Sequence, residues 1–139
     1  MRNTWSVVCL VVSFAAATAS AGEPPEHVPG TTVDMPYLIA PVVVDGTLVA
    51  NAYVSSKIVA TSAAATIVVR DRLPFIQDAF VRDVNASPIG KASDPKTVDT
   101  AALAKRLQDD ATRVAGKSFV ESVQVIRVQV SELRGGARN

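Results

Sequence analysis

Residues 37–59, YLIAPVVVDGTLVANAYVSSKIV, decide the fold, because they describe two apolar strands joined by a tight turn. Asp45-Gly46 between apolar runs predicts a type I′ hairpin, since that turn needs positive φ at both central residues. The first strand is expected from Tyr37 to Val44, and Pro41, which lacks an N–H, indicates an edge position or a strand start. The second strand is expected from Thr47 to Val59, with alternate apolar residues on one face: Leu48, Ala50, Ala52 and Val54.

A long helix is predicted after the hairpin, from about Ser62 to Ala86. Either Thr61 or Ser62 can cap its start. Pro74 removes the hydrogen bond to the carbonyl of Arg70, so we expect a kink there or two abutting helices. Steps of three and four residues define its apolar stripe: Val69, Leu73, Ile76, Phe80 and Val84.

A polar loop over residues 85–98 is expected to lead into a second helix, from Thr100 to Ala115. Asp99 is a suitable N-cap, and Gly116 suits a left-handed position just after the helix. The apolar stripe of this helix has similar spacing: Leu103, Leu107, Ala111 and Val114.

A valine-rich strand is predicted from Phe119 to Leu133, and its alternation changes phase partway along. A β-bulge near Val125 would reconcile the two halves; alternatively the strand is central and covered on both faces. The element order is therefore β-β-α-α-β, which predicts an α+β domain over residues 37–133 with two helices on one face of an antiparallel sheet. The tail 134–139 is expected to fray.

The N-terminus predicts export. Arg2, an apolar run and the small residues Ala19-Ser20-Ala21 fit a cleaved signal peptide over residues 1–21, placing the chain in the periplasm. The alternative is an uncleaved anchor that holds the chain at the inner membrane, facing the periplasm. Residues 22–36, with four prolines, are expected to be a linker. Cys9 is the only cysteine, so a disulfide framework is excluded.

The sequence contains few residues that could support catalysis or the binding of a cofactor, a metal ion or nucleic acid. Fourteen Lys and Arg balance thirteen Asp and Glu, without a basic stripe, which argues against nucleic-acid binding. His27, the only histidine, falls in the expected linker, outside any fixed pocket. We expect no catalytic, cofactor or metal site.

Charged residues on the two helices are expected to be solvated rather than functional. Two pairs of carboxylates could be proposed for acid–base work, but neither converges: Asp71 with Asp78, and Asp109 with Asp110. Three arginines surround the first helix and could meet an acidic partner or lipid headgroups, yet each lies among aspartates: Arg70, Arg72 and Arg82.

The domain resembles the periplasmic domain of the FliL family, the flagellar basal-body-associated proteins. Three features carry the resemblance: the hairpin leading into a long second strand (residues 42–59), the helical segment RDRLPFIQDAF (residues 70–80), and the leucine-spaced second helix followed by the valine-rich strand (residues 103–130). Members of that family usually carry a cytoplasmic segment and an uncleaved transmembrane helix, and this sequence departs from both.

The resemblance implies a non-enzymatic protein that associates with itself and with the flagellar stator or basal body, modulating motility. One alternative is an exported accessory or binding domain of the same fold, unrelated to flagella. Another is a small enzyme that uses carboxylates alone, for which no convergent polar constellation can be named.

Overall fold

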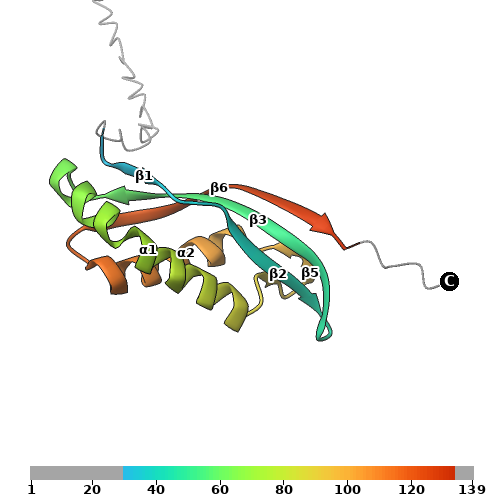
Figure 1. Cartoon of the computed structure of the whole chain (residues 1–139). Helices are drawn as coiled ribbons and strands as arrows, with labels where there is room; N and C mark the ends of the chain where they lie inside the picture. The colour runs from blue at the N-terminus through green and yellow to red at the C-terminus, as the bar shows by residue number, and fades with distance from the viewer. Residues whose placement is uncertain (1–29, 134–139) are drawn as a thin grey trace, which may run out of the picture.

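The computed structural model describes residues 30–133, and over this range the chain forms an antiparallel sheet with two helices on one face (Figure 1). The elements follow in the order β1 (Thr32–Asp34), β2 (Leu38–Val44), β3 (Thr47–Ala60), α1 (Ala63–Ala86), β4 (Gly90–Lys91), β5 (Asp94–Val98), α2 (Thr100–Ala115) and β6 (Val120–Glu132). The predicted α+β class and the placing of both helices on one face are confirmed. The predicted signal peptide, His27, Cys9 and the tail lie outside the described residues.

The hairpin forms as predicted. Asp45 has φ of 49° and Gly46 has φ of 75°, as a type I′ turn requires. β3 lies at the centre of the sheet, with β2 and β1 successively along one side and β6 along the other. Residues 50, 52 and 54 of β3 are buried beneath the helices, but Leu48, predicted on the same face, is 45% exposed, because Val49 is an extra residue in the pairing with β2 and interrupts the alternation.

The lead-in is shorter than predicted, because β1 occupies part of the expected linker 22–36. Val33 and Met35 are buried, and the Met35 N–H donates to the carbonyl of Ser56 at 3.0 Å. Ordered structure therefore begins before Tyr37, since the far half of the long β3 offers an edge on which a short segment can pair.

The two long helices have the predicted caps. The Ser62 hydroxyl accepts from the Ala65 N–H at 3.0 Å, and the Asp99 carboxylate accepts from the Ala102 N–H at 3.0 Å. α1 is one helix of 24 residues that runs through Pro74, so the expectation of two abutting helices is wrong. α2 has the predicted bounds, and Gly116 closes it with φ of 108°.

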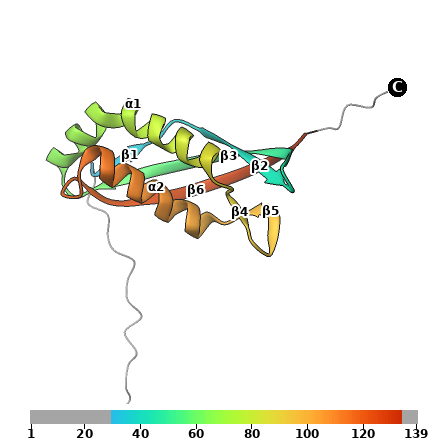
Figure 2. The same ribbon diagram turned by 90° about the horizontal axis from the view of Figure 1, so that it is seen from below.

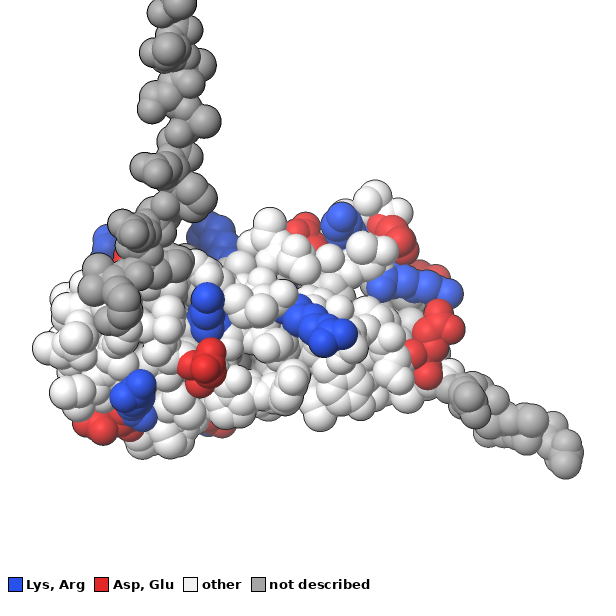
Figure 3. Space-filling model, turned by 90° about the horizontal axis from the view of Figure 1, so that it is seen from above, with Lys and Arg blue, Asp and Glu red and all other residues white. Residues whose placement is uncertain are grey.

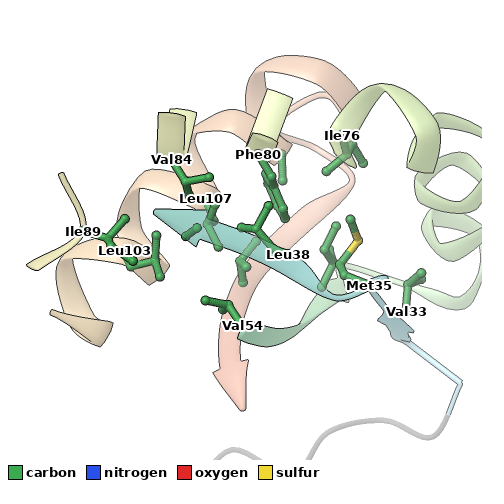
Figure 4. Close-up of a cluster of buried hydrophobic side chains, with 14 of the residues drawn as sticks. Val33, Met35, Leu38, Val54, Ile76, Phe80, Val84, Ile89, Leu103 and Leu107 are labelled. Atoms are coloured by element: carbon green, nitrogen blue, oxygen red, sulfur yellow. The ribbon is translucent and has the colours of Figure 1, made fainter. Parts of the chain in front are cut away.

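The core lies between the helices and the sheet (Figure 4). Ile76, Phe80 and Val84 of α1 are almost fully buried, and they point toward the sheet with Leu103 and Leu107 of α2. Leu73 and Val114, the remaining members of the predicted stripes with incomplete burial, pack against the rim of this core. Burial of these side chains is the main favourable contribution to folding.

The predicted loop 85–98 instead contains a small hairpin of β4 and β5, seen beside the helices in Figure 2. Asp94 organises it locally, since its carboxylate accepts from the Lys96 N–H at 3.2 Å and from the Thr97 hydroxyl at 2.5 Å. These two hydrogen bonds hold the pKa of Asp94 below its ordinary value, with the Thr97 contact contributing most.

β6 contains the predicted bulge. Its partners on β3 shift between Arg127, opposite Ser55, and Val125, opposite Ser56, so Ile126 is the extra residue. The bulge returns Val128 and Val130 to the helix-bearing face that Val123 already occupies. The alternative of a central strand is wrong, because β6 pairs only with β3 within residues 30–133.

Candidate functional site

A hollow of about 530 Å³ lies between α1 and α2, on the outer side of the helix pair. It forms where the outward-facing side chains of the two helices meet above the core. Phe75 is its most prominent apolar residue, because 63% of its surface is exposed. Its other walls carry both apolar and charged side chains: Asp78, Arg82, Asp83, Asp110, Arg113 and Val114. We call this hollow the interhelical groove.

Asp110 is the unusual residue of the interhelical groove. Its side chain is only 8% exposed, and Arg113, one turn further along α2, contacts its Oδ1. Its other oxygen, Oδ2, is buried and has no hydrogen-bond partner within the described part of the chain. A buried carboxylate oxygen without a donor costs free energy, and because Oδ2 itself is inaccessible to solvent, a donor from outside reaches it only when a neighbouring side chain moves.

Burial raises the pKa of Asp110, and the negative charge of Asp83 raises it further. Arg113 and Arg106 oppose this rise without cancelling it. The carboxyl group therefore holds its proton to a higher pH than an exposed aspartate does.

Asp83 is held by Arg106, which reaches across from α2 to the last turn of α1. The Arg106 Nε donates to Asp83 Oδ2 at 2.9 Å, and the side chains are 27% and 23% exposed. The same guanidinium donates to the main-chain carbonyls of Asp83, Ser87 and Pro88 at 3.0, 3.3 and 2.9 Å. The wall of the groove beside Asp110 is thus rigidly placed.

Three of the four carboxylates considered as pairs are exposed, as predicted. Asp71 is open to solvent, Asp78 pairs with Arg82 at 2.7 Å, and Asp109 pairs with Lys105 at 3.0 Å. Arg70, Arg72 and Arg82 are likewise exposed. Such solvated pairs contribute little to stability.

The prediction for Asp110 is wrong, since this residue is buried. Its position in the sequence contained the signal: residue 110 lies three after Leu107 and seven after Leu103, which places it on the apolar stripe of α2. The roles of Asp83 and Arg106 were also missed. Their contact joins different helices, so no spacing within either helix indicates it.

The lining of the interhelical groove offers hydrogen bonding, ion pairing and apolar contact. Within residues 30–133 there is no histidine or cysteine, and no cluster of three side chains that could bind a metal ion. Over the same range, no helix is both long and apolar enough to span a bilayer.

A second exposed apolar surface lies on the helix-free face of the sheet. Figure 3, viewed from that side, shows a largely uncharged surface with isolated charges. Ile39 and Tyr53, opposite one another on β2 and β3, are 54% and 39% exposed there. Of the three buried side-chain atoms without a partner among residues 30–133, only the one of Asp110 belongs to a residue that lines the interhelical groove.

Comparison with protein-family models and with curated proteins finds no match to this chain.

Proposed function

We propose that this protein is an exported, non-enzymatic module that binds a partner protein, with the interhelical groove as the contact surface. One observation carries the proposal: the buried Asp110 Oδ2 lacks a hydrogen-bond donor in a hollow whose rim bears a largely exposed phenylalanine. Exposed aromatic residues beside unsatisfied polar groups are typical of sites completed by a partner.

The chemistry of the groove defines the partner segment. An apolar side chain of the partner would cover Phe75 and Val114, the two largest apolar residues of the wall. A lysine, arginine or amide group beside it would donate to Asp110, displacing the exposed Arg113, whose side chain is 70% accessible. Three carboxylates favour a cationic donor over an anionic one: Asp78, Asp83 and Asp110.

The resemblance to the FliL family supports a partner at the flagellar basal body or stator, reached in the periplasm. The features behind that resemblance are the hairpin with its long second strand, the segment 70–80, and the second helix followed by the valine-rich strand. In this role the module adjusts motor output without catalysing a reaction. Cleavage after Ala21 would release it into the periplasm, whereas a retained N-terminus would hold it at the inner membrane.

The alternative function is that of a periplasmic accessory domain whose partner belongs to the envelope rather than to the flagellum. The same groove would serve it, because its side chains determine the chemistry of the partner segment and not the assembly to which that segment belongs. A host without flagella would favour this alternative directly.

The test is gene deletion in the native host, followed by complementation with wild type, Phe75→Ala or Ile67→Ala. Ile67 is the matched control, since it lies on the same helix, is 62% exposed and does not line the groove. We expect deletion to leave flagellar filaments in place but to change swimming in soft agar. Phe75→Ala should behave like the deletion and Ile67→Ala like wild type, at equal protein levels by immunoblot.

Two outcomes would overturn parts of this proposal separately. Unchanged swimming after deletion would remove the flagellar role and leave the accessory function. Equal effects of Phe75→Ala and Ile67→Ala would remove the groove as the contact surface.

A further inference from the structure

No strand pairs with the outer edge of β6 within residues 30–133, because β6 pairs only with β3. It is 13 residues long, and an exposed edge of that length is a ready template for another strand. The question is which part of the edge is accessible and what strand it fits.

The direction of the free main-chain groups follows from the ladder with β3. The Leu133 N–H donates to the Val49 carbonyl at 2.9 Å, so Leu133 faces β3. Alternate residues of an antiparallel strand face the same side, and the register is regular back to Arg127. The N–H and C=O groups of Val128, Val130 and Glu132 therefore point away from the sheet.

The two halves of the edge differ in their protection. In the first half, α2 packs against β6, the Gln108 amide donates to the Glu121 carbonyl at 3.3 Å, and the bulge at Ile126 interrupts the strand. Such features are common means of blocking edge-to-edge association. Residues 127–132 have none of them.

The opposite edge of the sheet is blocked by a proline. Pro41 lies opposite Asn51, whose main chain faces β6, so the position of the missing Pro41 N–H is on the outer edge of β2. The second half of β6 is thus the accessible edge of the sheet.

We propose that this edge pairs with the same segment of a second copy, antiparallel, about a two-fold axis at Gln129. Val128 then lies opposite Val130 of the second copy, and Val130 opposite its Val128. Both residues direct their main-chain groups outward, so each Val–Val pair exchanges two hydrogen bonds. The two sheets become continuous, with all four helices on one face.

The side chains of this register are self-complementary. Val130 is 46% exposed on the helix-bearing face, and pairing covers it with the valine of the other copy. On the other face Arg127 lies opposite Ser131, and no residue of the segment meets a like charge. A shift of two residues in one direction places Val130 opposite the bulged Ile126. A shift of two residues in the other direction places Glu132 opposite Val128.

The dimer does not depend on the interhelical groove or on the flagellar role, since α1 lies away from the β6 edge. A pairing of about five residues on each side, 127–131, is a small interface, so we expect association at micromolar concentrations or above.

Disulfide trapping tests the register directly, using the full chain with Cys9→Ser so that each introduced thiol is alone. At the two-fold axis the Gln129 Cα atoms would be about 4.5 Å apart, within reach of a disulfide. Gln129→Cys should therefore form a covalent dimer on mild oxidation. Ser131→Cys is the matched control, because four residues would separate the two thiols by about 13 Å. No dimer from Gln129→Cys, or equal dimer from both variants, would overturn the proposal.

A second measurement determines the affinity of the dimer with the wild-type protein. Sedimentation equilibrium from about 10 µM to 1 mM should show a monomer–dimer equilibrium. Val130→Lys should weaken it by about tenfold or more, because it sets a charge on the paired edge. Ile39→Lys, at 54% exposure on β2, across the sheet from β6, should not. A monomer at every concentration, or equal weakening by both variants, would refute edge pairing whatever the swimming assay shows.

Discussion

Arg106 of α2 donates through Nε to the carboxylate of Asp83 at 2.9 Å, and through its other nitrogens to the carbonyls that end α1. α1 has no basic residue in its own last turn, so the neighbouring helix supplies the positive charge that the carbonyl end of a helix favours. This single side chain therefore caps one helix and locks the angle at which the two helices meet.

Replacing Arg106 should lower the free energy of unfolding by more than the partial exposure of its side chain suggests. Arg106→Met keeps much of the aliphatic stem but removes every donor to the Asp83 carboxylate and to the carbonyls of Ser87 and Pro88. We expect the free energy of unfolding to fall by about 2–3 kcal/mol, measured by urea denaturation. Lys105→Ala removes the adjacent, exposed ion pair with Asp109 and should change it by less than about 0.5 kcal/mol. Similar losses from both would show that Arg106 acts only as a surface charge.

Asp110→Asn should make the protein more stable at neutral pH. Since the pKa of Asp110 is raised above 3.8, the folded chain holds its proton more tightly than the unfolded chain does. Stability is therefore lost as pH rises from 3.8 through the folded-state pKa, and the loss is complete above it. The amide cannot ionise, so we expect a gain on the order of 1 kcal/mol at pH 7 and little difference near pH 3.

The pH series has an internal control of opposite sign. The pKa of Asp94 is lowered, so its ionised form favours the folded chain above 3.8, and that contribution fades as pH falls through the folded-state pKa. Asp94→Asn should reduce stability at neutral pH, whereas Asp110→Asn raises it. A loss of stability at pH 7 in Asp110→Asn would mean that the contact with Arg113 outweighs the cost of burial.

Local signals in the sequence were enough for much of the fold. The type I′ turn at Asp45-Gly46, the caps of both helices and the bulge in β6 each depend on a few adjacent residues, and each forms as predicted. β1 could not be found in this way. Residues 32–34 have no alternating run of their own, and they form a strand only because the far end of β3 provides a partner.

The interhelical groove likewise combines features that local sequence patterns predict with features that depend on tertiary contacts. The spacing of α2 places Asp110 on the buried stripe, so its burial was predictable from residues 103–114. Its missing donor and the Arg106–Asp83 contact depend on how two helices cross, which no period in the sequence encodes. The exposure of Phe75 follows from spacing too, because residue 75 lies off the apolar stripe of α1 that contains Leu73 and Ile76.

Gly90→Ala should disturb the small hairpin before α2. A Cβ at residue 90 would lie 2.2 Å from the main-chain oxygen of Pro95, so β4 and β5 would have to separate. We expect a loss of about 1–3 kcal/mol in the free energy of unfolding, measured by urea denaturation. Lys91→Ala, exposed on the same short strand, should stay within about 0.5 kcal/mol of wild type. Wild-type stability in Gly90→Ala would show that the hairpin can open without cost.

Pro74→Ala should stabilise the protein, because α1 continues through a residue that cannot donate to the ladder. Proline inside a helix costs about 3 kcal/mol relative to alanine, and Pro74 is exposed, so alanine leaves no cavity. We expect a gain of about 1–3 kcal/mol by urea denaturation, with Arg72→Ala on the same helix as the control for changes in propensity alone. A stable variant that fails to restore swimming would indicate that the proline shapes the groove beside Phe75. A destabilised variant would mean instead that the core has adapted to the backbone that Pro74 imposes.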